Sequence, residues 1–431
     1  MLFPFLFPSL PKADFDKVML REPSECRNDA RRKTVKRRDF HRTAIAMGAW
    51  GLTAAQAASV QGANDRIRVA VIGCGVRGSQ HIPDILECRK MGVEISHVCD
   101  VWRGAREAAA AAVKKGQDTP VQAVEDYRSI LSSPETGAVV IATPDFSHAK
   151  ILKEAAEAGK DAYCEKPMAV NLQEALAAVD AVRANRRVVQ SGTQYSSDGN
   201  FIACANAVQS GVLGKITRIA ISQNFNEPRW RKDYDDVREQ DVNWPLFELH
   251  HGAHPFSAKK FRRWYLYRDY TNGLPGLWMS HFLNAVAWFM QDLFPAQAAC
   301  SAAVLRWGDD GRETEDSLSA ILDYPSGFQL NFSMSLCNAA DTHFIIYGSN
   351  GKLDVWNREL SGDGGDGPDQ IKEKRVLAPE NPPNSHMADF LDCVRSRKDP
   401  RCPVEMGLAH SVAGILCAES NRLGKRLRYD R

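Results

Sequence analysis

A hydrophobic run that leads directly into a glycine-rich turn constrains the fold of this chain most. Residues 67–72 (IRVAVI) are rich in Val and Ile, which is typical of a buried parallel strand. Gly73, Gly75 and Gly78 follow in the spacing G-x-G-x-x-G, and residues 79–90 have a helical pattern. In this context glycines let the backbone approach a diphosphate, whose charge lies at the helix N-terminus. Alternatively, the three glycines form a turn that has only a structural role and binds no diphosphate. The residues expected to bind a dinucleotide are Gly73, Gly75, Val76, Arg77 and Gly78.

Strand-like and helix-like segments continue to alternate after this turn. Residues 93–100 and 138–144 have the composition of further buried strands, and residues 101–115 and 148–159 have that of helices. Such alternation predicts an α/β fold over residues 64–193, namely a Rossmann doubly wound parallel sheet with helices on both faces.

An acidic residue ends the second predicted strand. Asp100 lies 22 residues after Gly78, where a carboxylate can accept hydrogen bonds from an adenosine ribose. A 2′-phosphate beside this carboxylate would be repelled, so the expected cofactor is NAD or NADP, with NAD favoured. Arg103 and Arg106 are close enough in sequence to weaken that preference.

Two further loops follow predicted strand ends, where an open α/β sheet binds its ligands. They are residues 142–148 (ATPDFSH) and 163–170 (YCEKPMAV). Pro144 and Pro167 fix the backbone just beyond their strands, and a proline in such a turn can be cis. Lys166 should point into the cofactor crevice, although a lysine here can also be an ordinary surface charge.

The order of these motifs resembles a known family. VIGCGVRG, CD, ATPDFSH and CEKP are followed by VVQSGTQYSS and VQSGVLGKITRI. From about Ile67 to the C-terminus, the chain is similar to the glucose-fructose oxidoreductase, inositol dehydrogenase and rhizopine catabolism protein (Gfo/Idh/MocA) family. The resemblance implies an N-terminal dinucleotide-binding domain and a C-terminal domain with a large open, mostly antiparallel sheet. It also implies oxidation or reduction of a sugar, cyclitol or related polyol through nicotinamide.

The resemblance also assigns residues to the cofactor site. Thr143 and Pro144 are placed near the nicotinamide half, and Lys166 reaches both cofactor and substrate as a catalytic residue. The further cofactor contacts implied are His148, Glu165 and Pro167.

The second domain is also indicated by the residues themselves. After about residue 195 longer strand-like segments follow one another, and turns at Pro325–Gly327 and Ser349–Gly351 separate several of them. Two amphipathic segments near the end should pack back against the body as helices. The expected division is an N-terminal extension (1–63), a Rossmann domain (64–193) and an α/β substrate and oligomerisation domain (194–431).

Oxidising a secondary alcohol requires a base near the hydroxyl, and histidine suits that task. His281 matches the family's catalytic histidine, but Leu277 stands four residues earlier, where the family has Asp. Asn284, Tyr195 or the histidines of LHHGAH must therefore replace the carboxylate that acts with the histidine. Otherwise the family's usual oxidation is altered or lost. The candidate substrate-binding residues are Gln194, Tyr195, His250, His251 and Asn284, with His254 closing the histidine group.

Composition argues against a metal site and against nucleic acid. The 11 cysteines contain no C-x-x-C pair, and no carboxylate-rich motif accompanies the closely spaced histidines of LHHGAH, so we expect no metal. Beyond residue 57 the chain carries 44 Lys and Arg against 47 Asp and Glu, with no basic stripe. Nucleic acid is therefore not an expected partner.

The N-terminus has the layout of an export signal. Arg37, Arg38 and Phe40 precede a short apolar run and an A-x-A sequence at Ala55–Ala57, which resembles a twin-arginine signal cleaved near residue 57. The run is too short to span a bilayer. A periplasmic or otherwise exported protein is expected, and a solvated basic linker on a cytoplasmic protein is the alternative.

Export and a nicotinamide cofactor together require the enzyme to carry its cofactor with it. The leading hypothesis is an NAD(P)-dependent oxidoreductase with a tightly held cofactor. A glycoside hydrolase, lyase or epimerase with no net redox change is the second. A non-catalytic binding protein is the third, because of Leu277. An exposed sheet face makes a homo-oligomer possible.

Overall fold

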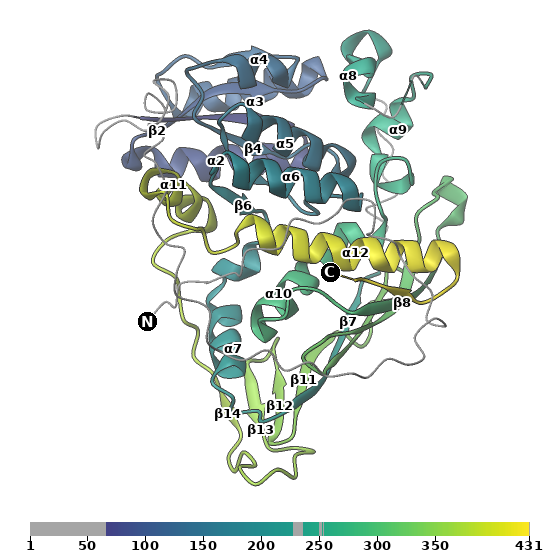
Figure 1. Cartoon of the computed structure of the whole chain (residues 1–431). Coiled ribbons are helices and arrows are strands. Elements are labelled where there is room, and N and C mark those ends of the chain that lie inside the picture. The colour runs from purple at the N-terminus through teal and green to yellow at the C-terminus, as the bar shows by residue number, and fades with distance from the viewer. Residues whose placement is uncertain (1–65, 227–235, 250–251, 253, 431) are drawn as a thin grey trace, which may run out of the picture.

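The computed structural model describes residues 66–226, 236–249, 252 and 254–430. These residues form a Rossmann lobe and a second lobe built on a large open sheet (Figure 1). The predicted export signal, His250 and His251 lie outside the described residues. Among the helices that the structure describes, none combines the length and the apolar character needed to cross a bilayer.

The Rossmann lobe contains a six-stranded parallel sheet of order β3-β2-β1-β4-β5-β6. Val69 and Val71 of its first strand face one hydrophobic core, whereas Ala70 and Ile72 face another, so helices cover both sides of the sheet. The predicted doubly wound sheet is confirmed. The strands are β1 (Ile67–Ile72), β2 (Val93–Cys99), β3 (Gln122–Val124), β4 (Ala138–Ile141), β5 (Asp161–Cys164) and β6 (Val189–Ser191). The helices are α2 (Val76–Glu87), α3 (Arg103–Gly116), α4 (Tyr127–Ser132), α5 (His148–Glu157) and α6 (Leu172–Ala184).

The second lobe contains a nine-stranded sheet of order β14-β13-β12-β11-β7-β10-β9-β8-β15, in which only the β7–β10 pair is parallel. The predicted mostly antiparallel sheet is therefore confirmed. Its strands are β7 (Ile216–Asn224), β8 (Gln297–Ala303), β9 (Ser317–Asp323), β10 (Gln329–Ser335), β11 (His343–Gly348), β12 (Gly351–Asp354), β13 (Glu359–Ser361), β14 (Arg375–Val376) and β15 (Leu427–Arg428). Its helices are α7 (Gly199–Gln209), α8 (Trp244–Glu248), α9 (Ala258–Arg262) and α10 (Ser280–Met290).

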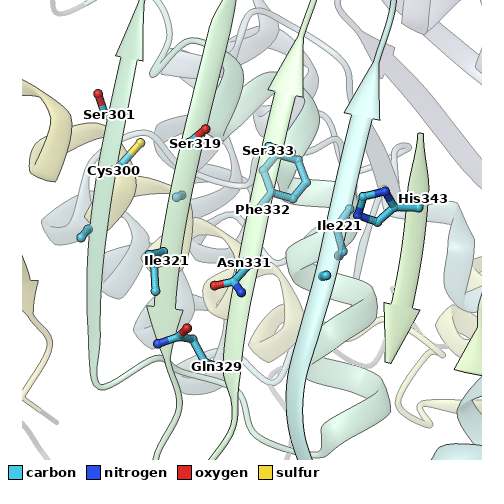
Figure 2. A pocket seen from close by; sticks show the side chains of 13 residues that line it. Ile221, Cys300, Ser301, Ser319, Ile321, Gln329, Asn331, Phe332, Ser333 and His343 are labelled. Atoms are coloured by element: carbon cyan, nitrogen blue, oxygen red, sulfur yellow. The ribbon is translucent and has the colours of Figure 1, made fainter. Parts of the chain in front are cut away.

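Among the described residues, helices cover one face of the nine-stranded sheet and leave the other face open. Phe282 of α10 packs against Phe332 and Phe344, with ring centroids 5.6 and 6.2 Å apart. On the other face the side chains of Ile321 and Asn331 line a shallow hollow (Figure 2). The alternation of buried and exposed residues along β9 and β10 follows from this one-sided packing.

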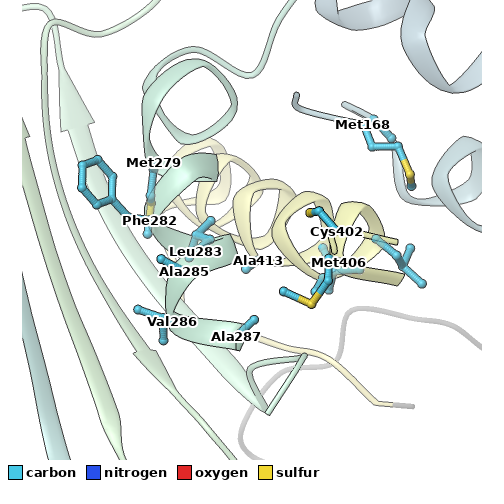
Figure 3. Packing of buried hydrophobic residues seen from close by; sticks show 14 of the residues in the cluster. Met168, Met279, Phe282, Leu283, Ala285, Val286, Ala287, Cys402, Met406 and Ala413 are labelled. Carbon is cyan, nitrogen blue, oxygen red and sulfur yellow. The ribbon is translucent and has the colours of Figure 1, made fainter. Parts of the chain in front are cut away.

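Two C-terminal helices connect the lobes. Phe390 of α11 (His386–Ser396) is buried in the core that α2 covers, although it follows strands β7 to β14 of the second lobe in sequence. The long helix α12 (Val404–Leu423) runs between the lobes, against α6 and β6 on one side and α10 and β8 on the other (Figure 1). Met406 and Met168 belong to this interface (Figure 3).

Short turns complete the chain path. Gly327, with φ +90°, closes the β9–β10 hairpin at the predicted Pro325–Gly327 turn. The 3₁₀ turns are η2 (Cys88–Met91), η3 (Asp145–Ser147), η4 (Gln194–Ser197), η6 (Glu239–Asp241), η7 (Trp264–Leu266) and η9 (Gly308–Asp310), and η8 (Pro275–Met279) is a π-helical turn.

Candidate active site

The three glycines after β1 have different surroundings. Gly73 has φ +87°, and a Cβ there would lie 2.6 Å from the backbone of Ala142. A Cβ at Gly78 would lie 1.8 Å from the carbonyl oxygen of Gly73. At Gly75, by contrast, a Cβ would meet no atom within 4 Å. The first and third glycines are therefore needed for close packing, and the second leaves open space in front of the backbone.

The helix that follows begins beside this open space. Helix α2 starts at Val76, and no side chain caps its N-terminus at Gly75. The amide groups of an uncapped first turn attract anions, because they lie at the positive end of the helix dipole. The uncapped turn and the space at Gly75 together fit the diphosphate of a dinucleotide.

Asp100 lies beside the glycine turn at the end of β2. Its Oδ2 accepts a hydrogen bond from the Cys74 amide at 2.7 Å, and its Oδ1 accepts one from the Trp102 amide at 2.8 Å. Burial raises the pKa of Asp100, although these amides and Arg106 oppose the shift. Each carboxylate oxygen has a second lone pair, so Asp100 can still accept hydrogen bonds from a ribose.

Glu165 joins the loop of residues 163–170 to helix α2, which follows the glycine turn. Arg77 Nε donates to its Oε1 at 2.7 Å, and His81 Nε2 lies 2.7 Å from the same oxygen. Gln194 Nε2 also donates to it, at 3.4 Å. Burial alone would raise the pKa of Glu165, but His81 and Arg77 outweigh burial and hold it well below its ordinary value. Glu165 is therefore a charged anchor for Arg77 and not a proton donor.

Lys166 links the Rossmann lobe to the second lobe. Its Nζ donates a hydrogen bond to the carbonyl oxygen of Leu277 at 2.6 Å. Leu277 belongs to the π-helical turn η8 that leads into α10, and such turns often occur at functional sites. Burial lowers the pKa of Lys166, and the charges of Asp145 and Glu165 oppose the shift. The Lys166–Pro167 bond is the cis peptide in the described part of the chain.

Asp145 is a buried acid that sequence reasoning missed. Thr271 donates a hydrogen bond to its Oδ2 at 2.7 Å. Burial raises the pKa of Asp145 to about 6, against the opposing charges of Lys166 and His148. The available signal was its position directly after Pro144, at the end of a predicted strand.

His148 fixes the two loops relative to each other. Its Nδ1 lies 2.8 Å from the carbonyl oxygen of Pro167, and its Nε2 lies 2.7 Å from that of Thr143. The imidazole therefore contacts a backbone carbonyl of each loop through a different ring nitrogen. Thr143 Oγ1 in turn accepts a hydrogen bond from Ser147 at 2.7 Å.

His281 lies close to Lys166 and Tyr195. Burial lowers the pKa of His281 to about 3, and the charge of Lys166 lowers it further. The imidazole is therefore neutral at ordinary pH. Its ring centroid is 5.6 Å from that of Tyr195, and within the described residues the imidazole makes no hydrogen bond. Lys166 and His281 thus share one environment.

The proposed replacements for the missing carboxylate are differently placed. Tyr195 lies beside His281, whereas Asn284 is fully buried and donates to Cys402 Sγ at 3.4 Å. His254 Nδ1 lies 2.5 Å from Glu248 Oε2, within a separate aromatic cluster. For the residues that the structure places, no three His, Cys, Asp or Glu side chains form a metal-binding group.

His410 is a second buried histidine that sequence reasoning missed. It lies on α12, and its Nε2 accepts a hydrogen bond from the Met168 amide at 3.1 Å. Burial lowers its pKa to about 3, with Lys166 contributing. The amphipathic pattern of α12 gave no sign of this role, because the partner of His410 is 242 residues away in sequence.

Two family models match the chain. The model of an oxidoreductase family with an NAD-binding Rossmann fold, GFO_IDH_MocA, matches residues 67–193. The GFO/IDH/MocA C-terminal domain model matches residues 245–354. Together the two models cover more than half of the chain.

Curated relatives match part of the chain. A glycosyl hydrolase family 109 protein of Shewanella baltica is 30% identical over 172 residues, which are 39% of this chain and 37% of the relative. An inositol 2-dehydrogenase of Rubrobacter xylanophilus is 33% identical over 156 residues, which are 36% of this chain and 43% of the relative. The chain thus spans about two fifths of the length of these relatives.

A solved structure matches nearly over its full length. The WlbA dehydrogenase of Bordetella pertussis, in complex with NADH and UDP-GlcNAcA, has a TM-score of 0.64 at 19% identity. The match covers 85% of this chain and 99% of that one, and at this identity it shows a shared fold. From the two family models and this fold, the chain belongs to the Gfo/Idh/MocA family of oxidoreductases.

Proposed function

We propose that this protein is an NAD(P)-dependent oxidoreductase that acts on a sugar, cyclitol or related polyol and holds its cofactor tightly. The observation that carries the proposal is the 2.6 Å hydrogen bond from Lys166 Nζ to the Leu277 carbonyl. This contact brings the cofactor-binding edge of the Rossmann sheet against the start of the helix that carries His281. The names of the inositol and WlbA dehydrogenases support the substrate class.

The bound nicotinamide supplies the acceptor or donor of the hydride. The glycine turn and α2 bind the diphosphate, and Asp100 accepts hydrogen bonds from the adenosine ribose. Lys166 has further N–H groups beyond the one bound to Leu277, so it can donate to the reacting oxygen of the substrate. His281, neutral beside it and without a hydrogen bond among the described residues, can accept a hydrogen bond from the substrate hydroxyl and orient it.

We infer that NAD is the preferred cofactor. Asp100 occupies the ribose position with both oxygens held by backbone amides, so it cannot turn away from a 2′-phosphate without losing two hydrogen bonds. Titrating the purified protein with NAD⁺ and NADP⁺ tests this inference. We expect tighter binding of NAD⁺, and tighter binding of NADP⁺ would contradict it.

A redox-neutral glycoside hydrolase is the second candidate. Two observations favour it, the likeness to glycosyl hydrolase family 109 proteins and the presence of Leu277 where the family has a carboxylate. In such a cycle the substrate is oxidised, loss of the proton beside the new carbonyl expels the alcohol of the glycosidic bond, water adds to the resulting double bond, and the carbonyl is reduced again with the same hydride. Oxidation and reduction then balance within one turnover.

Product analysis separates the two candidates. A panel of free sugars, cyclitols and aryl glycosides is incubated with the protein and NAD⁺. A keto product formed in step with NADH supports the oxidoreductase, whereas release of the aryl alcohol without net NADH supports the hydrolase. Lys166→Met should abolish either activity. Lys153→Met, at an exposed lysine on α5 paired with Glu157, should leave the activity unchanged. Full activity of Lys166→Met would contradict the proposal.

Export and self-association are also proposed. The arginine pair and Ala55–Ala57 support export by the twin-arginine pathway, and mass analysis of periplasmic material should find a chain cleaved near residue 57. The uncovered face of the nine-stranded sheet supports a homo-oligomer, with Ile321 40% exposed at its centre. Light scattering should then give more than one chain per particle, and Ile321→Arg should reduce that number.

A further inference from the structure

A segment of the second lobe lies against the cofactor edge of the Rossmann lobe. We call residues 236–249 and 254–275, which include α8 and α9, the bridging segment; Figure 1 shows these helices beside the Rossmann lobe. The Asn243 amide donates to the Val101 carbonyl at 2.9 Å, and Val242 forms an antiparallel bridge with Trp102. The Asn243 side chain donates to Glu125 Oε2 at 2.8 Å. The bridging segment is thus docked on the loops after β2 and β3.

The bridging segment is docked a second time on the loop after β4. Phe146 of that loop is buried among Trp244, Phe247 and Tyr270, with ring centroids 5.8 Å from Phe247 and 5.3 Å from Tyr270. The Phe146 amide donates to the Tyr270 carbonyl at 3.2 Å. The loops after β2 and β4 flank the two ends of the predicted dinucleotide crevice, so the bridging segment runs along its length.

Arg262 and Trp102 lie in contact at the end of the crevice where the adenosine is expected. The guanidinium of Arg262, from α9, lies over the Trp102 indole at 4.9 Å from the ring centroid. The positive charge of Arg262 acts on the carboxylate of Asp100, and Asp236 lies 3.4 Å from the same guanidinium. Phe261 packs edge-on against Trp102, with centroids 6.3 Å apart. The second lobe therefore brings a cation beside the expected ribose acceptor.

We propose that Trp102 and Arg262 form a wall over the adenosine end of the cofactor site, so that the dinucleotide leaves only when the bridging segment moves away. The inference rests on the proposed function and adds two positioning residues to it. The planar guanidinium stacked on the indole forms a flat surface that faces the expected ribose and adenine. A wall supplied by the same chain retains the cofactor without a partner subunit.

The release rate of a bound cofactor tests this inference. The full-length protein is loaded with a fluorescent ethenoadenine analogue of NAD⁺, and its release is followed after adding excess NAD⁺. Arg262→Gln removes the charge and Trp102→Phe reduces the stacking surface, and we expect each to speed release by about tenfold. Lys260→Gln is the matched control, because Lys260 lies on the same helix and faces Tyr267 and Asp269. It should release the analogue at the wild-type rate.

Three outcomes would overturn the inference. Unchanged release in both Arg262→Gln and Trp102→Phe would show that the wall does not control dissociation. Equal acceleration in Lys260→Gln would assign the effect to general loosening of the segment. A wild-type chain that binds neither the analogue nor NADP⁺ would overturn the proposed function together with the inference. The first two outcomes, observed together with normal cofactor binding, would overturn the inference alone. Because Trp102→Phe keeps a half-buried aromatic ring, it remains informative if Arg262→Gln does not fold.

Discussion

At the residue scale, two glycines of the same turn are required for different reasons, Gly78 for packing and Gly75 for binding a ligand. Gly78 packs against its own turn, because a Cβ would overlap the Gly73 carbonyl. Gly75 packs against nothing within 4 Å, yet it occupies the middle position of the fingerprint. The open space at Gly75 therefore has a function only if a ligand fills it.

Gly75→Ala should change dinucleotide binding and leave the fold intact. Its backbone, with φ −67°, suits alanine, so the free energy of unfolding should change by less than about 1 kcal/mol. The added methyl group meets the diphosphate, and affinity for NAD⁺ should fall roughly 100-fold, or about 3 kcal/mol. Urea denaturation and calorimetric titration measure the two effects. Gly78→Ala is the contrasting variant and should cost about 1–3 kcal/mol of stability by overpacking. Unchanged affinity in Gly75→Ala would show that no diphosphate lies there.

Asp145 couples stability to pH at the same site. Burial raises its folded pKa to about 6, above the ordinary value of 3.8, so the buried group favours the protonated form. Its contribution to stability is complete below about pH 4 and is lost as pH rises through 6. Asp145→Asn should therefore raise the free energy of unfolding above pH 6, by up to roughly 3 kcal/mol. Urea denaturation at neutral pH and near pH 4 measures this, and a variant less stable than wild type at neutral pH would contradict the account.

At the scale of elements, sequence patterns correctly predicted those strands and turns whose conformation depends mainly on neighbouring residues. The strands β1, β2 and β4 lie where runs of Val and Ile predicted them, and Gly327 closes a hairpin at a predicted turn. Each of these features depends on a few neighbouring residues, whose side-chain size and backbone freedom favour one conformation. The fold class was therefore readable from the sequence.

The site was only partly readable, because its contacts join distant segments. The hydrogen bond from Lys166 to Leu277 joins residues 111 positions apart in sequence. Its acceptor is a backbone carbonyl in a π-helical turn, and no pattern of side chains predicts such a turn. Asp145 directly follows Pro144 of a predicted loop, whereas His410 has no such neighbours in sequence. Only the packing of the loops and α12 brings the two residues near Lys166. The docking of the bridging segment on Trp102 was missed for the same reason.

Helix α11 offers a prediction at the element scale. Phe390 is fully buried in a core otherwise built from β1, β2, α2 and α3, so the C-terminal region completes the Rossmann lobe. Phe390→Ala should lower the free energy of unfolding by about 3–5 kcal/mol through the cavity it leaves. Leu423→Ala, at a residue 41% exposed, is the control and should stay within about 0.5 kcal/mol. A small effect at Phe390 would mean that the Rossmann lobe folds without α11.

At the scale of the whole molecule, the proposed cofactor site draws on both lobes. The Rossmann lobe supplies the glycine turn, Asp100 and Lys166, and the second lobe supplies His281 and the bridging segment. Helix α12 packs against both lobes and fixes their spacing (Figure 3). Chemistry at Lys166 and His281 therefore depends on a dinucleotide held between the lobes.

Native mass spectrometry of the purified protein, without added cofactor and then with NAD⁺, tests this claim most directly. We expect one nicotinamide dinucleotide per chain, retained through purification and absent from Gly75→Ala. A wild-type chain that carries no dinucleotide, and that gains none when millimolar NAD⁺ or NADP⁺ is added, would contradict the account.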